Sequence, residues 1–152
     1  MIAMIFVLSQ MGCSASGESG KVATQQGAKQ TETASKGDRL AKAAPATITD
    51  VPTALSDMTS KVKAYKQAIE SDQVEDAKKL ADEIGSLWNA VKSKLSADLA
   101  EGQQTIHEDV SALMEETYQE LWDKERLILL DYKIYQNLRD VRQAQEDQST
   151  NN

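Results

Sequence analysis

The clearest structural signal in the chain is the segment 51–69, VPTALSDMTSKVKAYKQAI. Large apolar side chains recur in it at alternating spacings of four and three residues, which places them along one side of an α-helix. They are Val51, Leu55, Met58, Val62, Tyr65 and Ile69. Asp50 can cap the first turn with its carboxylate, and Pro52 is tolerated there because the first turn needs no N–H from it. The segment therefore predicts an amphipathic helix that buries one side.

Three more apolar stripes follow with the same period. The first begins after Asp72 and Glu75, which have the spacing of a capping box, and it consists of Val74, Ala77, Leu80, Ala81, Ile84, Leu87, Trp88, Val91 and Leu95. Gly102 marks the expected loop to a third helix, whose apolar positions are Ile106, Val110, Leu113, Tyr118 and Leu121. The last stripe consists of Leu127, Leu130, Ile134, Leu138 and Val141. Polar residues interrupt the period near Trp122 and Asp123, which favours a turn there over one continuous helix.

Helices of this length joined by short loops typically form an up-down bundle. We therefore expect an all-α fold, an up-down helical bundle of three to four helices over residues 50–146. No segment shows the alternating pattern of a β-strand. Residues 147–152, DQSTNN, are expected to be a disordered tail.

The chain before the first helix has a different composition. Residues 13–49 are rich in Ser, Gly, Thr, Gln, Ala and Lys and contain almost no large apolar side chain. Such a segment buries too little surface to offset the entropy of ordering. We therefore expect a disordered linker that tethers the bundle.

The N-terminal residues 1–8, MIAMIFVL, carry no charged or polar side chain. A helix needs about 20 residues to cross a bilayer, so this stretch better fits the apolar core of a signal peptide. With Gly12 and Cys13 behind it, the segment resembles a bacterial lipoprotein signal. The resemblance implies that residues 1–12 are removed, and that a lipid on Cys13 anchors the chain at the extracytoplasmic face of the cell membrane. The alternatives are secretion with a nearby cleavage site and a cytosolic protein with an incidental cysteine.

Charge and cysteine content exclude several classes of function. Of the 17 basic and 24 acidic residues, five basic and three acidic ones precede residue 50, so 12 basic and 21 acidic residues leave the predicted bundle strongly negative. A negative domain repels the phosphates of nucleic acid, so we expect no nucleic-acid partner. The single cysteine excludes a disulfide framework and a cysteine-based metal cluster within one chain.

The sequence also lacks the motifs of an enzyme. No nucleophile motif and no glycine-rich phosphate loop is present, and the chain has one histidine, His107. One histidine cannot supply a multi-histidine metal site. We therefore expect a protein that is not an enzyme and has no cofactor.

A metal site built from carboxylates is a competing hypothesis. Glu116 and Glu120 share a helix face at spacing i,i+4, and Glu115 lies beside them, so their oxygens could hold a hard cation. His107 could complete such a site from another helix or subunit. The simpler interpretation is a solvated acidic face with a histidine at the surface or at a helix end.

The aromatic residues give a candidate partner-binding surface. Trp88, Trp122 and Tyr135 lie on or beside the apolar stripes, where aromatic side chains can recognise a partner helix. Packing in the core is the alternative interpretation.

Residues 76–141 are similar to the extracytoplasmic helical domains of bacterial high-affinity iron permeases and, more loosely, to imelysin-type iron-uptake lipoproteins. The similarity rests on Trp88, Val91, Lys92, Ile106, Asp109 and Leu113. It implies an extracytoplasmic helical module in the setting of metal uptake. It implies no iron ligand, because Val110 stands where imelysin-type proteins have a glutamate after their histidine.

These observations favour a membrane-anchored extracytoplasmic lipoprotein that works as a non-enzymatic binding or accessory module. Iron uptake is one setting, with an envelope protein such as a transporter as the partner. The two competing hypotheses are a metal-binding protein and a structural spacer or self-assembling coiled coil.

Overall fold

The computed structural model describes residues 38–150, with side chains for residues 39–147. The helices are α1 (Asp38–Lys42), α2 (Val51–Glu70), α3 (Val74–Val91), α4 (Ala100–Thr117) and α5 (Lys124–Thr150), with two short 3₁₀ turns, η1 (Lys92–Lys94) and η2 (Ala97–Leu99), between α3 and α4. Residues 38–150 contain no strand. The predicted all-α fold is confirmed.

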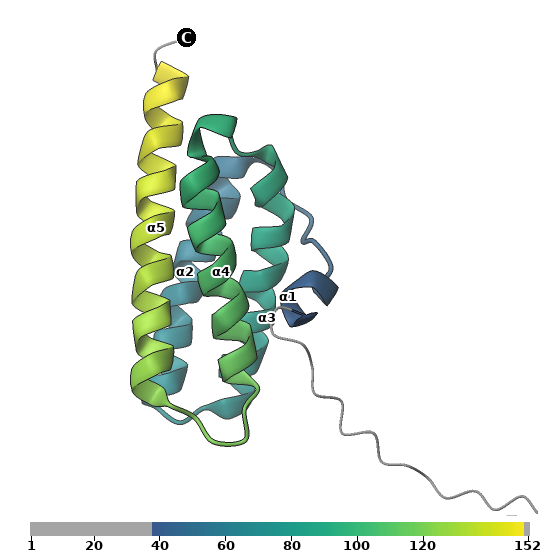
Figure 1. Ribbon diagram of the computed structural model, residues 1–152, viewed down its shortest axis with the longest axis vertical. Coiled ribbons are helices and arrows are strands. Elements are labelled where there is room, and N and C mark those ends of the chain that lie inside the picture. The colour runs from purple at the N-terminus through teal and green to yellow at the C-terminus, as the bar shows by residue number, and fades with distance from the viewer. Residues whose placement is uncertain (1–37, 151–152) are drawn as a thin grey trace, which may run out of the picture. The chain divides into compact units, whose positions relative to one another are not determined.

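The four long helices form an up-down bundle (Figure 1). Each one packs against the next in chain order, and α5 returns to pack against α2. The short helix α1 lies outside this ring, against α3 and α4. Helices α2 and α5 therefore form the face of the bundle opposite α1.

The apolar stripes of the sequence build the core. Leu55, Met58, Val62, Tyr65 and Ile69 of α2 are all fully buried, as are most members of the three later stripes. The predicted start of α2 is also confirmed, because the Asp50 carboxylate accepts a hydrogen bond from the Thr53 N–H at 2.8 Å.

The start of α3 differs from the prediction. Asp72 does not cap it: Gln73 occupies the cap position without a side-chain hydrogen bond. Asp72 has a φ of 57°, in the left-handed region that aspartate tolerates better than most residues. Its carboxylate pairs with Lys124 at 2.6 Å instead. The capping box therefore does not form, because Asp72 belongs to the turn before the helix.

Two predicted loops have different outcomes. The prediction of a loop at Gly102 is wrong, because α4 already begins at Ala100 and η1 and η2 link it to α3. A Cβ on Gly102 would lie 3.1 Å from Val141 Cγ2, so the glycine lets α4 pack closely on α5. The turn near Trp122 and Asp123 is confirmed, since α4 ends at Thr117 and α5 begins at Lys124. Leu121 lies in this turn and is exposed rather than helical and buried.

Both predicted ends of the bundle need correction. The part of the bundle before residue 50 includes α1, whose Leu40 is buried in the core with 1% exposure. At the other end, α5 continues to Thr150, through most of the predicted tail. The predicted signal peptide, Cys13 and the predicted linker up to residue 37 lie outside the described residues, as do residues 151–152. Within residues 38–150, no helix combines the length and apolar character that a membrane span requires.

Candidate functional site

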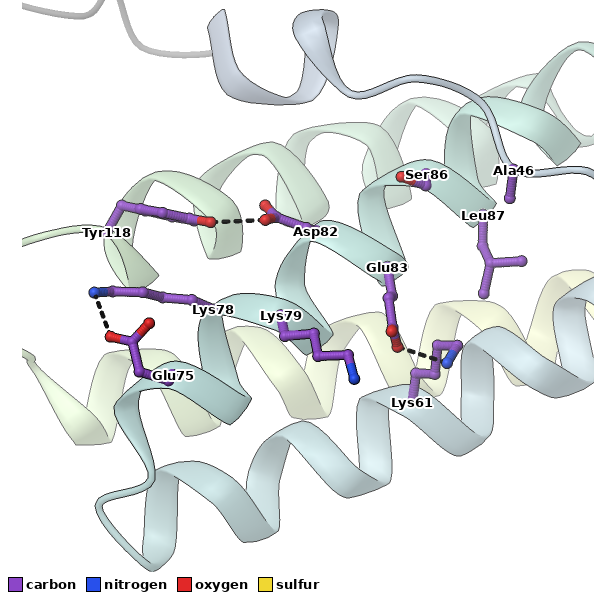
Figure 2. A pocket seen from close by; sticks show the side chains of 10 residues that line it. All are labelled: Ala46, Lys61, Glu75, Lys78, Lys79, Asp82, Glu83, Ser86, Leu87 and Tyr118. Carbon is purple, nitrogen blue, oxygen red and sulfur yellow. Dashed lines mark hydrogen bonds and ion pairs between the residues drawn. The ribbon is translucent and has the colours of Figure 1, made fainter.

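One cleft, of about 770 Å³, lies along α2 and α3 beside the segment that follows α1 (Figure 2). Most of its charged side chains have partners within the cleft. Lys61 pairs with Glu83 at 2.6 Å and Lys78 with Glu75 at 3.2 Å, and the Tyr118 hydroxyl donates to Asp82 at 2.7 Å. Burial and Asp82 raise the pKa of Tyr118 to about 12, so this phenol is a stable donor. The cleft is a network of satisfied contacts between elements.

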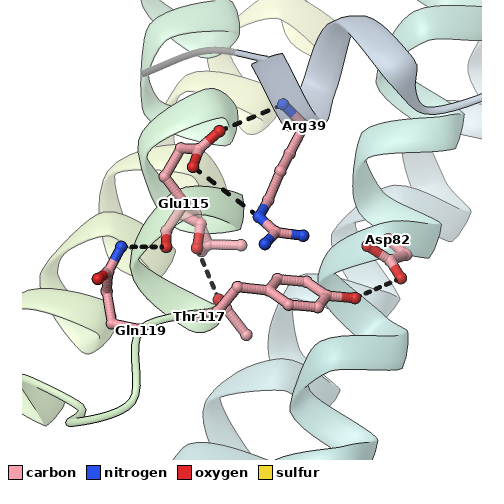
Figure 3. A network of polar contacts seen from close by, with 7 residues as sticks. Arg39, Asp82, Glu115, Thr117 and Gln119 are labelled. Atoms are coloured by element: carbon pink, nitrogen blue, oxygen red, sulfur yellow. Dashed lines mark hydrogen bonds and ion pairs between the residues drawn. The ribbon is translucent and has the colours of Figure 1, made fainter. Parts of the chain in front are cut away.

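A second polar network fixes α1 to the bundle. Figure 3 shows Arg39 reaching Glu115 of α4: its backbone N–H donates to Glu115 at 3.2 Å, and its Nε lies 3.8 Å from the carboxylate. The Arg39 guanidinium also stacks 3.9 Å from the centre of the Tyr118 ring. Asn89 donates from its side-chain amide to the carbonyls of Leu40 and Ala43, at 2.7 and 2.8 Å. These contacts hold α1 against α3 and α4, so the role of this network is structural.

The second cleft is a groove of about 670 Å³ between α2 and α5. We call it the α2–α5 groove; it is lined by Lys63, Lys66, Gln67, Glu70, Glu125, Ile128, Leu129, Asp131, Tyr132 and Tyr135. Its apolar residues come from α5, and two of them, Leu129 and Tyr132, are 53% and 59% exposed. Only four large apolar side chains within the described residues are exposed, so half of them gather in this groove. A concave apolar surface with a few polar groups is the usual form of a ligand site.

Asp131 is the unusual group of the α2–α5 groove. It is only 5% exposed, and its Oδ1 has no hydrogen-bond partner among the described residues. Burial raises its pKa to about 7, while nearby Lys66 lowers it and Glu70 raises it. Lys66 does not bond to Asp131 but pairs with Glu70 at 3.5 Å. A buried carboxyl without a partner costs stability, which is the kind of local conflict that marks functional sites.

His107 is not at a helix end. It lies within α4, half-buried, and its Nδ1 accepts a hydrogen bond of 3.2 Å from the indole N–H of Trp88 on α3. Burial lowers the pKa of His107, Lys92 lowers it further, and Glu108 opposes them. A neutral imidazole that accepts this bond joins two helices.

The predicted metal ligands are not brought together. His107 is about 12 Å along α4 from Glu115, at 1.5 Å per residue. Glu115 is held by Arg39, Glu116 pairs with Arg126 at 2.8 Å, and Glu120 is exposed beyond the end of α4. Within residues 39–147, no group of three or more His, Cys, Asp or Glu side chains could hold a metal ion. The acidic set serves as ion-pair partners and solvated surface instead.

The three predicted partner-binding aromatics have different positions. Trp88 is wrong as a surface residue, because it is fully buried in the core. Trp122 is half-buried against the core, and its indole N–H donates to the Thr117 carbonyl at 2.9 Å, which closes the turn before α5. Only Tyr135 lines the α2–α5 groove, with the Lys63 ammonium 5.3 Å from its ring centre.

Sequence reasoning missed the central residue of this groove. Asp131 follows Leu127 by four residues and precedes Ile134 by three, so it lies on the same side of α5 as two fully buried residues. A carboxylate on an apolar stripe is the signal that could have identified it. The exposed Leu129 and Tyr132 lie outside the stripe and gave a second signal.

Comparison of the chain with protein-family models, with curated proteins and with solved structures gives no match. The functional argument therefore rests on the residues and their geometry.

Proposed function

We propose that this chain is an extracytoplasmic lipoprotein, anchored in the cell membrane through Cys13, whose bundle is a non-enzymatic binding module with the α2–α5 groove as its binding surface. The observation that carries the binding role is the groove itself. It combines exposed Leu129 and Tyr132 with the buried, unpartnered Asp131. In the other large cleft, the acidic and basic groups largely satisfy one another.

The anchoring part of the proposal rests on the sequence of residues 1–13. It is tested by labelling cells that express the full chain with palmitate, in the presence and absence of globomycin. We expect labelled chain in the membrane fraction and its precursor on globomycin treatment. A Cys13→Ser chain that is still labelled and still sediments with membranes contradicts the anchor.

The binding part is tested in cells by a photoreactive benzoylphenylalanine at position 132 of the full chain. Position 133 is the matched control, because Lys133 is the neighbouring exposed residue of α5 and does not line the groove. After irradiation, we expect an added mass on the chain labelled at 132 and none on the chain labelled at 133. Equal labelling at both positions, or labelling at neither, contradicts a binding role for the groove.

The setting of metal uptake follows only from the similarity of residues 76–141 to iron-permease domains. In that setting the bundle is an accessory module of an envelope transporter. A transporter subunit recovered on the crosslinker at position 132 supports it.

A further inference from the structure

We propose that the α2–α5 groove binds a small organic amine with an apolar body, and that the Asp131 carboxylate accepts the hydrogen bond of its ammonium group. This inference rests on the proposed function, whose ligand class it names.

The charges of the groove call for a cation. Lys66 is engaged by Glu70 at 3.5 Å, and the ammonium of Lys63 lies over the Tyr135 ring. Among residues 39–147, neither Glu125 nor Asp131 has an ion-pair partner within 4.0 Å. Two unpaired carboxylates therefore line the groove, and its lysines have partners. An anionic ligand would meet their repulsion, whereas an ammonium would form a charge-assisted hydrogen bond.

Asp131 is built to recognise one donor group. With only 5% exposure it cannot be solvated as a surface carboxylate is, and its Oδ1 has no partner within the described structure. Asp131 lines the groove, so a donor that enters the groove can supply the partner that the carboxyl lacks. A metal ion is disfavoured because no second and third oxygen ligand is grouped with it in the described part of the chain. An amine needs only one carboxylate.

The walls of the groove fit an apolar body. Ile128, Leu129, Tyr132 and Tyr135 offer aliphatic and aromatic surface beside Asp131. The exposed faces of Leu129 and Tyr132 are the surface that such a ligand would remove from water. The tyrosine rings can also contact the cation through their π faces.

The size of the groove favours a small molecule over a docked helix. Its volume of about 670 Å³ lies within the range of about 300–1,000 Å³ found for small-ligand sites. Its lining spans residues 63–70 of α2 and 125–135 of α5, or about 10 to 15 Å at 1.5 Å per residue. A ligand of one ring and a short amine chain matches that length.

The site should respond to pH. Burial raises the pKa of Asp131 to about 7, so the carboxylate that the amine needs is largely lost at pH 6. The titratable groups that face Asp131 are Lys66, Glu70 and Tyr65 of α2. Burial raises the pKa of Tyr65, and Lys66 and Glu70 act on Asp131 with opposite signs.

The test is a titration of the full chain carrying Cys13→Ser with phenethylamine, followed by amide NMR shifts. Neutral 2-phenylethanol and anionic 3-phenylpropionate are the matched probes. At pH 8 we expect phenethylamine to bind at least about tenfold more tightly than either, with shifts confined to the residues of the groove. Its affinity should fall about tenfold between pH 8 and pH 6, as Asp131 is protonated.

Two variants assign the effect to the groove. Asp131→Asn should weaken phenethylamine binding about tenfold and leave 2-phenylethanol unchanged, whereas Asp57→Asn, at an exposed aspartate of α2 outside the groove, should change neither. Tyr132→Ala removes an exposed side chain that the core does not need, and it should weaken phenethylamine several-fold. It keeps the test valid if Asp131→Asn fails to fold.

Several results would overturn the inference. Equal affinity for the amine and the alcohol, or phenethylamine binding that neither Asp131→Asn nor Tyr132→Ala weakens, removes the amine site. A lysine-containing amphipathic peptide that binds a hundredfold more tightly than phenethylamine, and depends on Asp131, replaces the small amine with a protein partner. Crosslinking at position 132 without amine binding overturns this inference but leaves the proposed function standing. Amine binding without that crosslink leaves the amine site in the groove standing and contradicts only the binding role that the crosslink tests in cells.

Discussion

At the scale of single residues, Asp131 is the acidic residue on the buried side of α5. Its neighbours on the helix face, Leu127 and Ile134, are fully buried, and an apolar residue at 131 would complete their stripe. Burial raises the pKa of its carboxyl to about 7, so the group keeps its proton up to near neutral pH and is ionised above it. Packing alone does not explain an acid at this position, and the proposed binding role gives it a reason.

We predict that Asp131→Asn stabilises the fold at pH 8. Because the folded-state pKa is above the unfolded one, the native protein holds this proton between about pH 4 and pH 7, and stability is lost as pH rises through that window. The amide removes the loss, so urea unfolding should show a gain of about 2 to 4 kcal/mol at pH 8 and little change at pH 4. Asp57→Asn is the control, with no gain expected. A variant less stable than the wild type at pH 8 contradicts the buried, strained carboxyl.

His107 provides a second prediction at this scale. It is the single histidine of the chain, so its imidazole proton signal in NMR is unambiguous. Burial, and secondly Lys92, lower its pKa, so the midpoint should lie below 6.5. The lowered pKa means that its contribution to stability is present above pH 6.5 and is lost as pH falls through the folded-state pKa. Lys92→Gln should raise the midpoint, and a midpoint above 6.5 in the wild type would contradict the bond from Trp88.

The contacts of these side chains show which features the sequence alone could not predict. The apolar period identified the side of each helix that is buried, because one helix face follows from spacing alone. It could not say that Trp88 donates to His107, since the two lie on different helices and meet only through packing. Likewise, the i,i+4 spacing of Glu116 and Glu120 was real, but Arg126 and the end of α4 decide what each carboxylate does.

At the scale of elements, α1 and the segment after it are the main surprise. Their composition resembles that of a linker, and they contain two large apolar residues, Leu40 and Ile48. Leu40 is nevertheless buried, with Gly85 leaving room for it and for Met114 at the surface of α3. Asn89 and Ser86 of α3 then hold the backbone of the segment by hydrogen bonds. Composition could not predict this, because the partners that order the segment lie elsewhere in the chain.

We predict that Leu40→Ala lowers the free energy of unfolding by about 2 to 4 kcal/mol, the usual cost of a cavity at a buried leucine. Arg39→Gln on the same helix should cost less than about 1 kcal/mol, because its guanidinium is partly exposed and its backbone bond to Glu115 remains. Chemical denaturation of both variants measures the difference. Equal effects would show that the ion pair, rather than Leu40, fixes α1.

At the scale of the whole molecule, the limits of the bundle determine which residues a fragment must contain to keep its stability. The all-α class and the turn before α5 followed from the sequence, while the domain limits did not, because no apolar stripe of helical period precedes residue 51. Among the described residues, the physical boundary is the first element whose backbone and side chains are held by the rest of the bundle. That boundary lies at α1, where Leu40, Ala43 and Ala46 all contact or bond to α3 or its neighbours.

This boundary gives the last prediction. A fragment of residues 38–152 should unfold in urea with the same midpoint as the full chain carrying Cys13→Ser, because it keeps α1 and every contact that α1 makes with the bundle. A fragment of residues 50–152 should be less stable by about 3 kcal/mol or more, since it loses the buried Leu40 side chain and leaves the Asn89 amide without the carbonyls it binds. Removing α1 also uncovers Met114 and Tyr118, so the shorter fragment should bind a dye for apolar surface where the longer one does not. Equal stability of the two fragments would mean that α1 rests on the bundle without supporting it, and the domain would then begin at α2.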